Sequence, residues 1–210
     1  SRRAGGVRRR ARRAPGRSFD GCNAMGTVCG IQRATDEQIE QMMGDPDAVA
    51  LFLEPNPEYI VALQAWSEEV KREPANAPPC PEDPAHLYID KAWHGLHYLL
   101  CGSSNEGQAP LHFILAGGVV VEAPEPTEYP TRAIRAAEVA EIDAALRDVT
   151  PDTLAARFDP QAMEAANVYP RIWVRDGSVA LEYLTEYFKE LKPFIAETAQ
   201  RGEGIVISLG

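Results

Sequence analysis

The chain has 210 residues, of which 45% are hydrophobic and 25% charged, a composition typical of one globular domain that excludes a fibrous or wholly disordered protein. Its formal net charge of -10 hides an asymmetry. Residues 1–24 carry eight arginines and one acid, Asp20, whereas the remaining residues carry 13 basic and 30 acidic side chains, a net charge of -17. Phosphates would repel so acidic a body, which excludes nucleic acid as its partner.

Residues 1–24 are predicted to be a disordered basic leader. Their only large apolar side chains are Val7 and Phe19, too few to offset the chain entropy lost on folding. No apolar run follows the arginines, so the segment is not a secretory signal. Its Arg, Ala, Gly and Pro bias is typical of translated GC-rich upstream DNA, and we expect the native domain to start at Met25 and span residues 25–210. The alternative interpretation, a nucleic-acid-binding arm, is disfavoured by the acidic body.

Neither a membrane nor an oxidising compartment is indicated by the sequence. No apolar run approaches the roughly 18–20 residues that cross a bilayer. After the leader, three cysteines remain, Cys29, Cys80 and Cys101, and they are odd in number and widely spaced. This usage predicts reduced thiols in the cytoplasm, and it disfavours both a disulfide framework and a zinc ribbon. We expect no cofactor.

The N-terminal half is predicted to contain one strand, three helices and a proline-rich surface loop. Serine, threonine and aspartate caps, and proline at the first helical position, mark where helices begin. The expected elements are a buried strand over residues 25–33, a helix from the cap Thr35 to Gly44, a helix opened by Asp45-Pro46, a helix over residues 58–72 and the loop over residues 73–84.

The C-terminal half is predicted to be mostly helical and to close with a strand. The expected elements up to residue 149 are a helix capped by Asp90 and ended by Gly102, a short helix opened by Pro110, a strand from Val119 and a helix over residues 137–149. They are followed by two short helices opened by Thr150-Pro151 and Asp159-Pro160, an extended or turn-like segment over residues 169–174, a long helix from Val179 that Pro193 should kink or break, and a strand at residues 205–209. Together they predict a single compact α/β or α+β domain, with a small sheet covered by a majority of helices.

The segment LYIDKAWHGLHYLLCG resembles the signature of the YfbM-like family, bacterial proteins grouped as a domain of unknown function. The pattern is D-K-x-W-x-x-L-H, an apolar run and glycine. It is matched by Asp90, Lys91, Trp93, Leu96, His97 and Gly102, whereas His94 is not part of it. Met25-Gly26 with Cys29-Gly30, Arg157-Phe158, and Tyr169-Pro170 with Trp173 also match. The resemblance covers about residues 25–210, implies one α/β domain and implies no established activity, so no residue is predicted to be catalytic.

The helix after Asp90 carries the candidate site. At about 100° per residue, Asp90, His94, His97 and Cys101 fall within a stripe about 60° wide. These residue types are competent metal ligands, and His112 could add another, although we predict no metal. A His–Asp pair could instead serve as a general base and its orienting group.

The structural alternative gives each residue of this stripe an ordinary role. Asp90 then caps the helix, His97 packs beside Trp93 with one hydrogen bond, His94 lies at the surface, and Cys101 is a small buried side chain. If the helix lines a cleft instead, the binding candidates are Asp90, Trp93, His94 and His97.

Two functions remain open from the sequence, and they belong to different classes. The first is a non-enzymatic intracellular binding or accessory protein whose acidic surface attracts a basic protein partner, an immunity-like role being one version. The alternative is a small metal-dependent or general-base hydrolase that uses Asp90, His94 and His97. The aromatic residues Tyr169, Trp173, Tyr183 and Tyr187 are predicted to be core and interface side chains, with a binding patch as the alternative. The oligomeric state is not predicted.

Overall fold

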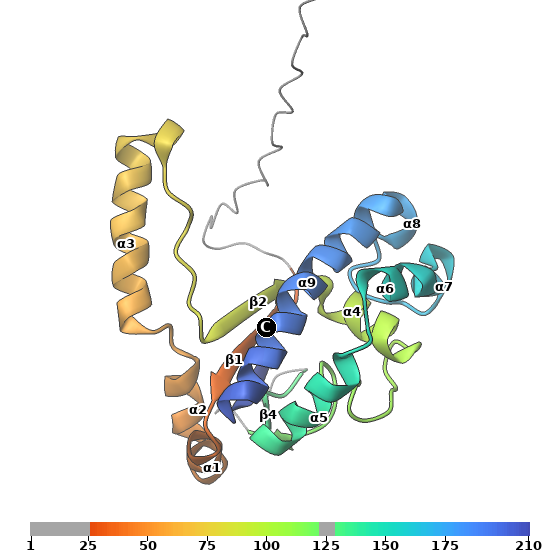
Figure 1. The fold of residues 1–210 in the computed structure, drawn as a ribbon, viewed down its shortest axis with the longest axis horizontal. Coiled ribbons are helices and arrows are strands. Elements are labelled where there is room, and N and C mark those ends of the chain that lie inside the picture. The colour runs from red at the N-terminus through yellow and green to blue at the C-terminus, as the bar shows by residue number, and fades with distance from the viewer. Residues whose placement is uncertain (1–25, 122–128) are drawn as a thin grey trace, which may run out of the picture.

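The computed structural model describes residues 26–121 and 129–210, so the prediction of a disordered leader lies outside the described residues. The elements in chain order are β1 (Cys29–Ala34), α1 (Asp36–Gly44), α2 (Pro46–Leu53), α3 (Pro57–Arg72), the 3-10 helix η1 (Pro74–Asn76), β2 (His86–Asp90), α4 (Ala92–Cys101), β3 (Val119–Val120), β4 (Arg132–Ile134), α5 (Ala136–Leu146), α6 (Pro151–Arg157), α7 (Pro160–Ala165), α8 (Trp173–Asp176), α9 (Ser178–Arg201) and β5 (Gly204–Leu209) (Figure 1).

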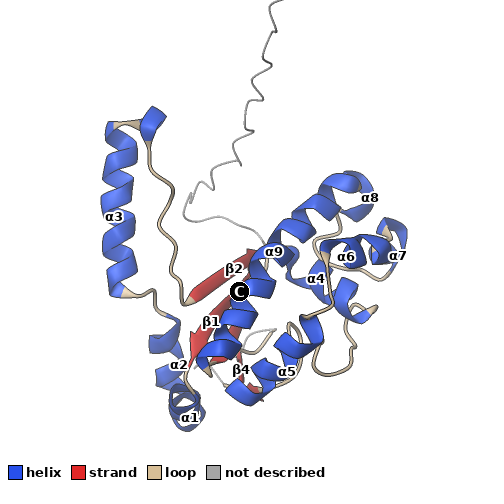
Figure 2. Cartoon of the chain, in the orientation of Figure 1, coloured by secondary structure: helices blue, strands red, loops and turns tan. Residues whose placement is uncertain are grey.

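The strands form one five-stranded sheet in the order β2-β1-β5-β4-β3, with every neighbouring pair antiparallel. The two strands predicted near the chain ends, β1 and β5, pair along their full lengths, from Cys29 with Leu209 to Ala34 with Gly204. They occupy the centre of the sheet. The architecture is α+β with helices in the majority, as predicted, and α9 crosses in front of β1 and β2 in the view of Figure 2.

The sheet separates a large core from a small one. In β5, Ile205 and Ile207 belong to the large core, which contains buried residues of α4, α5 and α9, whereas Val206 belongs to the small core with residues of α1 and α2. This assignment follows the two-residue period of a strand, which sends successive side chains to opposite faces. The candidate helix α4 contributes buried residues to the large core and contacts β2, α6 and α9.

Helix starts agree with the caps read from the sequence. Thr35 accepts a hydrogen bond from the Gln38 amide at 3.2 Å, and Asp45 accepts one from the Asp47 amide at 3.0 Å. Thr150 and Asp159 open α6 and α7 in the same way. Each side chain satisfies an amide that the first helical turn leaves without a partner.

A break of the long helix at Pro193, one of the two predicted effects, is wrong, because α9 is helical from Ser178 to Arg201. Pro193 is exposed, while Phe194 and Ile195 beside it are buried in the large core. A proline inside a helix costs about 3 kcal/mol, and burial of one large apolar side chain stabilises by about 1.5–3 kcal/mol. Packing of the residues around Pro193 therefore outweighs its lost hydrogen bond.

The structure differs from the sequence-based expectations in three further places, for tertiary reasons. The strands β2 and β4 were not predicted, because pairing with β1 and β5 makes strands of short segments that lack a strong pattern. The short helix expected from Pro110 is a series of turns, and the carbonyls of Phe113, Ile114 and Gly117 accept hydrogen bonds from Arg132 instead. The segment 169–174, expected to be extended or turn-like, is so up to residue 172 and then enters the short helix α8.

Residues 35–85, here called the arm, leave the sheet after β1 and return at β2. Its base, α1 and α2, packs on the small core through Ile39, Met42 and Val49. Its outer part, α3, stands beside the body rather than on it (Figure 1). None of the 16 residues of α3 is buried, and within the described chain no residue of α3 belongs to either core. The arm is therefore anchored at its base.

Candidate functional site

Asp90 is the last residue of β2 and not the N-cap of α4, so the predicted cap is wrong. The N-cap position belongs to Lys91, which makes no side-chain capping bond. The pairing of β1 with β2 skips Ile89, since Cys29 faces Asp90 and Gly30 faces Tyr88. Asp90 has a left-handed backbone with φ of 47°. An aspartate tolerates this conformation better than most residues, and the bulge re-aims its side chain.

The Asp90 carboxylate is held by Tyr183 of α9. The Tyr183 hydroxyl donates to Asp90 Oδ2 at 3.0 Å and accepts the Lys91 backbone amide at 3.2 Å. Burial, followed by the charge of Asp90, raises the pKa of Tyr183 far above its usual value. Burial and Asp90 also raise the pKa of Tyr169. These contacts place a carboxylate beside two neutral phenols where β2 meets α4.

Trp93, in the first turn of α4, packs against Tyr169 and is 1% exposed. Its ring stacks on Tyr169 with centroids 5.6 Å apart and on His94 at 4.8 Å, and its Nε1 donates to the Thr27 carbonyl. The interpretation of the aromatic residues as core and interface side chains is consistent with these contacts, since Trp173 is fully buried and Tyr183 packs edge-on against Tyr187.

His94 is buried, with 7% of its surface exposed, so its predicted surface position is wrong. Its Nδ1 accepts the Tyr169 amide at 3.0 Å, which leaves the hydrogen on Nε2 to be donated to the Ser104 carbonyl at 2.7 Å. Burial lowers its pKa. Both ring nitrogens are thus bonded to the backbone of the segments of Ser104 and Tyr169, and the ring stacks on Trp93.

His97 is completely buried and packs with one backbone hydrogen bond, as the structural alternative predicts. Its Nε2 donates to the Glu106 carbonyl at 3.2 Å, and its Nδ1 faces the Cys101 thiol at 3.9 Å. Burial lowers the pKa of His97 to about 4, so the ring is neutral near pH 7. The loop that His94 and His97 fasten covers this side of α4.

The stripe does not converge on a common point in the folded chain. The Asp90 carboxylate faces Tyr183, whereas the imidazoles face the loops. Among the described residues, no three His, Cys, Asp or Glu side chains gather to hold a metal ion. His112 lies nearby, and its Nδ1 is buried without a hydrogen-bond partner in the described part of the chain. A metal or general-base role for His94 would require a ring nitrogen to release its backbone partner, whereas His97 keeps Nδ1, which faces the Cys101 thiol, free of a backbone bond.

Stability is expected to fall as the pH drops from about 6.5 to about 4. Burial depresses the pKa of both His94 and His97 below the usual value of 6.5, so the unfolded chain binds more protons than the folded chain in this range. Thermal melts at intervals between pH 7 and pH 4 measure the slope. A His97→Asn variant should show a shallower slope than the wild type, and an unchanged slope would contradict the contribution of His97.

Arg132 of β4 is a buried charged residue that sequence reasoning missed. Its guanidinium donates to the carbonyls of Phe113 at 3.1 Å, Gly117 at 3.1 Å and Ile114 at 2.6 Å. Burial lowers its pKa to about 10, and Cys29, whose own pKa burial raises to about 12, lies close by. Nothing in the motif pattern signals this role, because the three carbonyls belong to a turn distant in sequence.

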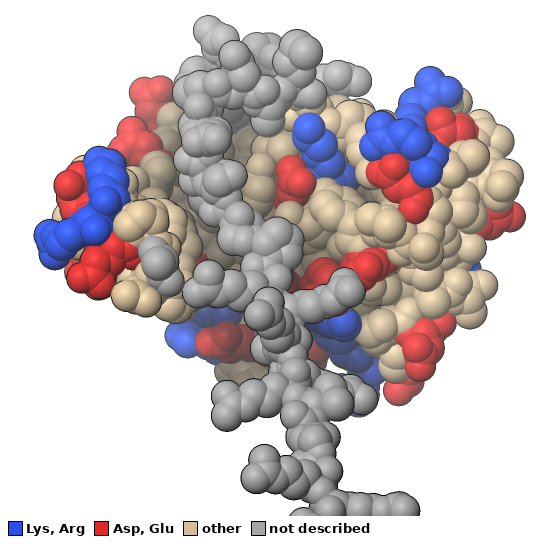
Figure 3. Space-filling view, turned by 90° about the horizontal axis from the view of Figure 1, so that it is seen from above, with Lys and Arg blue, Asp and Glu red and all other residues tan. Residues whose placement is uncertain are grey.

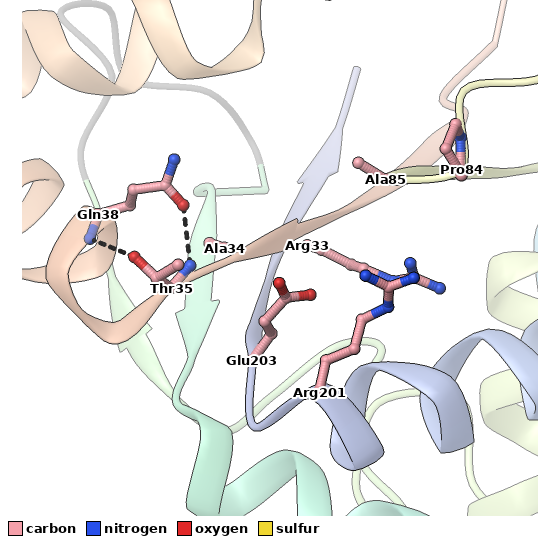
Figure 4. Close-up of a pocket in the computed structure, with 8 residues that line it drawn as sticks. All are labelled: Arg33, Ala34, Thr35, Gln38, Pro84, Ala85, Arg201 and Glu203. Carbon is pink, nitrogen blue, oxygen red and sulfur yellow. Dashed lines mark hydrogen bonds between the residues drawn. The ribbon is translucent and has the colours of Figure 1, made fainter.

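A shallow pocket of about 190 Å³ lies at the base of the arm, between β1, α1 and the end of α9 (Figure 4). Its buried cation, Arg33, is already bound within the chain, since its side chain pairs with Glu197 at 2.9 Å, donates to Thr198 and lies over the Phe194 ring. Arg201 also pairs with Glu197. The Arg33 amide donates to the Ala85 carbonyl at 2.8 Å. The pocket marks the junction between arm and body.

The acidic residues of the chain are concentrated in the arm. Residues 35–85 contain 12 acidic and two basic side chains, and the other described residues contain 15 acidic and 11 basic ones. Both bases of the arm, Lys71 and Arg72, lie in the last turn of α3, so residues 35–70 contain nine acids and no base. Figure 3 shows acidic and basic side chains side by side at the end of the arm, in keeping with this position.

Comparisons with known proteins agree with this architecture. A family model described as "Domain of unknown function (DUF1877)" matches residues 25–208. The fold is similar to the crystal structure of YfbM, a protein of unknown function from Escherichia coli, with a TM-score of 0.54 and 15% identity over 87% of this chain and 99% of that one. None of the curated proteins matches the chain. In the described residues, no helix is long and apolar enough to cross a membrane.

Proposed function

The chain belongs to the DUF1877 family, the YfbM-like family that its motif of Asp90, Lys91 and Trp93 indicates. From this premise we propose that it is a non-enzymatic binding protein and that its arm binds a basic protein partner. The family description names no activity, so the proposal rests on this chain's own charges. The observation that carries it is the run of residues 35–70, with nine acids and no base.

Several acids of the arm are solvent-exposed and can act on a partner, while Glu40 pairs with Arg135 and Glu68 with Lys71. Glu54, Glu58 and Glu69 are all exposed. A local field of one sign steers an oppositely charged protein and accelerates its association, and salt weakens the effect because the Debye length is only about 8 Å at physiological ionic strength. An immunity-like protein that neutralises a basic effector in the cytoplasm is one concrete version of this function.

Removing three charges from the arm is expected to weaken the binding of a basic probe about tenfold, since exposed charge pairs each contribute a few tenths of a kcal/mol to 1 kcal/mol. The variant is Glu54→Gln/Glu58→Gln/Glu69→Gln, in which all three positions are exposed. The measurement is fluorescence anisotropy of a labelled 20-residue polylysine at low and at physiological salt.

The matched control removes three exposed acids outside the arm, in the variant Glu141→Gln/Asp148→Asn/Glu182→Gln. It changes the net charge equally and should leave the affinity within about twofold of the wild type, because screening limits the reach of distant charges. Equal weakening by the two variants would show that net charge alone binds the probe. Absence of binding to the wild type would reject the proposed function.

A further inference from the structure

The C-terminal end of α4 places a thiol beside an imidazole nitrogen that no backbone group uses. Cys101 follows His97 by four residues, a spacing that brings two side chains to the same face of a helix. His97 Nδ1 lies 3.9 Å from Cys101 Sγ, whereas its Nε2 donates to the Glu106 carbonyl. We propose that Cys101 and His97 together bind a soft monovalent metal ion, Cu(I). This inference departs from the sequence-based expectation of no metal, and it is independent of the function proposed for the arm.

The separation of the two donor atoms fits one metal ion bound between them. Zinc–sulfur and zinc–imidazole bonds are about 2.3 Å and 2.1 Å long, and the bonds of Cu(I) are of similar length. With bonds of this length, the distance of 3.9 Å between Sγ and Nδ1 gives an angle of about 125° at the metal, close to that of trigonal coordination. Neither side chain has to move, and the His97 bond to Glu106 is kept. The ion would take the place of the Cys101 thiol proton, which is released to solvent.

The segments that surround this pair supply an entry path and a further free nitrogen. A Cβ on Gly107 would lie 2.6 Å from Cys101 Sγ and 2.8 Å from His112 Cβ, so the backbone of this exposed glycine lies directly beside the sulfur. His112 Nδ1 is buried and lacks a hydrogen-bond partner in the described part of the chain. It is an adjacent donor and not a third ligand, because the three side chains do not gather at one point. An ion or a water bound in this region would give this nitrogen a partner.

The charges near the pair favour a monovalent soft ion over a dication. Burial raises the pKa of the Cys101 thiol, and the charge of Arg157 opposes this effect. Burial is also the main cause of the low pKa of His97, and Arg132 is among the charged groups that add to it. A thiolate and Cu(I) form a neutral pair beside these two guanidinium groups, whereas Zn²⁺ would leave a positive charge there and usually requires four ligands. Sulfur and imidazole are also ligand types that suit copper.

The test titrates the reduced full chain with Cu(I) in competition with a chromogenic chelator. The background is Cys22→Ser/Cys80→Ser, in which Cys101 and the completely buried Cys29 are the remaining thiols. We expect one Cu(I) per chain, with a sulfur and a nitrogen neighbour in copper X-ray absorption. Adding Cys101→Ser should weaken the affinity at least about a hundredfold, because loss of a group that only orients a metal ligand already costs about 10–100-fold.

The second variant, His97→Gln, keeps a donor for the Glu106 carbonyl but removes Nδ1, and it should weaken Cu(I) binding by a similar factor. Its control is His86→Gln, at an exposed histidine of β2, which should bind Cu(I) as the background does. Circular dichroism checks the fold, and Cys101→Ser decides alone where His97→Gln fails to fold. Unchanged affinity in Cys101→Ser, no stoichiometric binding by the background, or displacement of Cu(I) by equimolar Zn²⁺ would overturn the inference. Each of these results would leave the proposed function of the arm standing.

Discussion

Replacing Arg132 with methionine is expected to lower the free energy of unfolding by about 3 kcal/mol or more. Methionine preserves much of the length of the side chain but none of its donors. The carbonyls of Phe113, Ile114 and Gly117 would lose their donor. The hydrogen bonds to Phe113 and Ile114 are buried, and Arg132 itself is only 7% exposed. Each buried carbonyl left without a donor costs about 1–3 kcal/mol, which the relief of burying a charge offsets only in part.

Urea unfolding at pH 7 followed by tryptophan fluorescence measures this loss, because Trp93 and Trp173 report on the large core. The control is Arg147→Met, at an exposed position of the same residue type, which should change stability by about 0.5 kcal/mol or less. Arg132→Lys should fall between the two, because an ammonium cannot span three carbonyls as a planar guanidinium does. Wild-type stability in Arg132→Met would show that the turn stands without these bonds.

Local sequence rules predicted those parts of the fold that local chemistry decides. The caps Thr35, Asp45, Thr150 and Asp159 open helices where expected, and Gly102 ends α4 with the left-handed backbone that glycine readily adopts. The central strands were predicted as well, because buried apolar runs near both ends of the chain have few alternatives to a sheet. These signals lie within a few residues of the structure that they specify.

The candidate site could be predicted only as a segment, because its contacts join distant parts of the chain. Tyr183 binds Asp90 across 93 positions, and Tyr169 binds His94 across 75. A helical wheel shows which side chains share a face but not which segments cover that face, so it treated Asp90 and the histidines as one stripe. Asp90 ends β2 and precedes α4, so a helical wheel does not describe where its side chain lies.

The body and the arm use their charged residues differently. Those of the body stabilise the fold, whereas those of the arm carry the proposed function. In the body, charged and polar groups such as Arg132 and His94 bind backbone groups and fasten loops. In the arm, α3 contributes to no core among the described residues, and its acids face solvent. The acidic run over residues 35–70 is present in the sequence. Only the structure shows that these residues form an arm whose outer helix stands beside the body.

Replacing His97 with alanine is expected to lower the free energy of unfolding by about 2–4 kcal/mol, through the cavity left behind and the lost hydrogen bond to Glu106. A histidine that served chiefly as a ligand or general base would be lost with little effect on stability. His97 is completely buried, and its neighbour Trp93 is 1% exposed, so the imidazole fills space that no flexible side chain can reoccupy.

Denaturant unfolding near pH 8, where both the folded and the unfolded states hold a neutral imidazole, isolates this packing contribution from titration. His86→Ala is the matched control, because His86 is exposed on β2 at the edge of the sheet, and it should change stability by about 0.5 kcal/mol or less. A His97→Ala protein as stable as the wild type would reverse the assignment and favour a site on α4. A large loss of stability confined to His97→Ala would show that the imidazole holds the Glu106 loop on α4 by packing and hydrogen bonding.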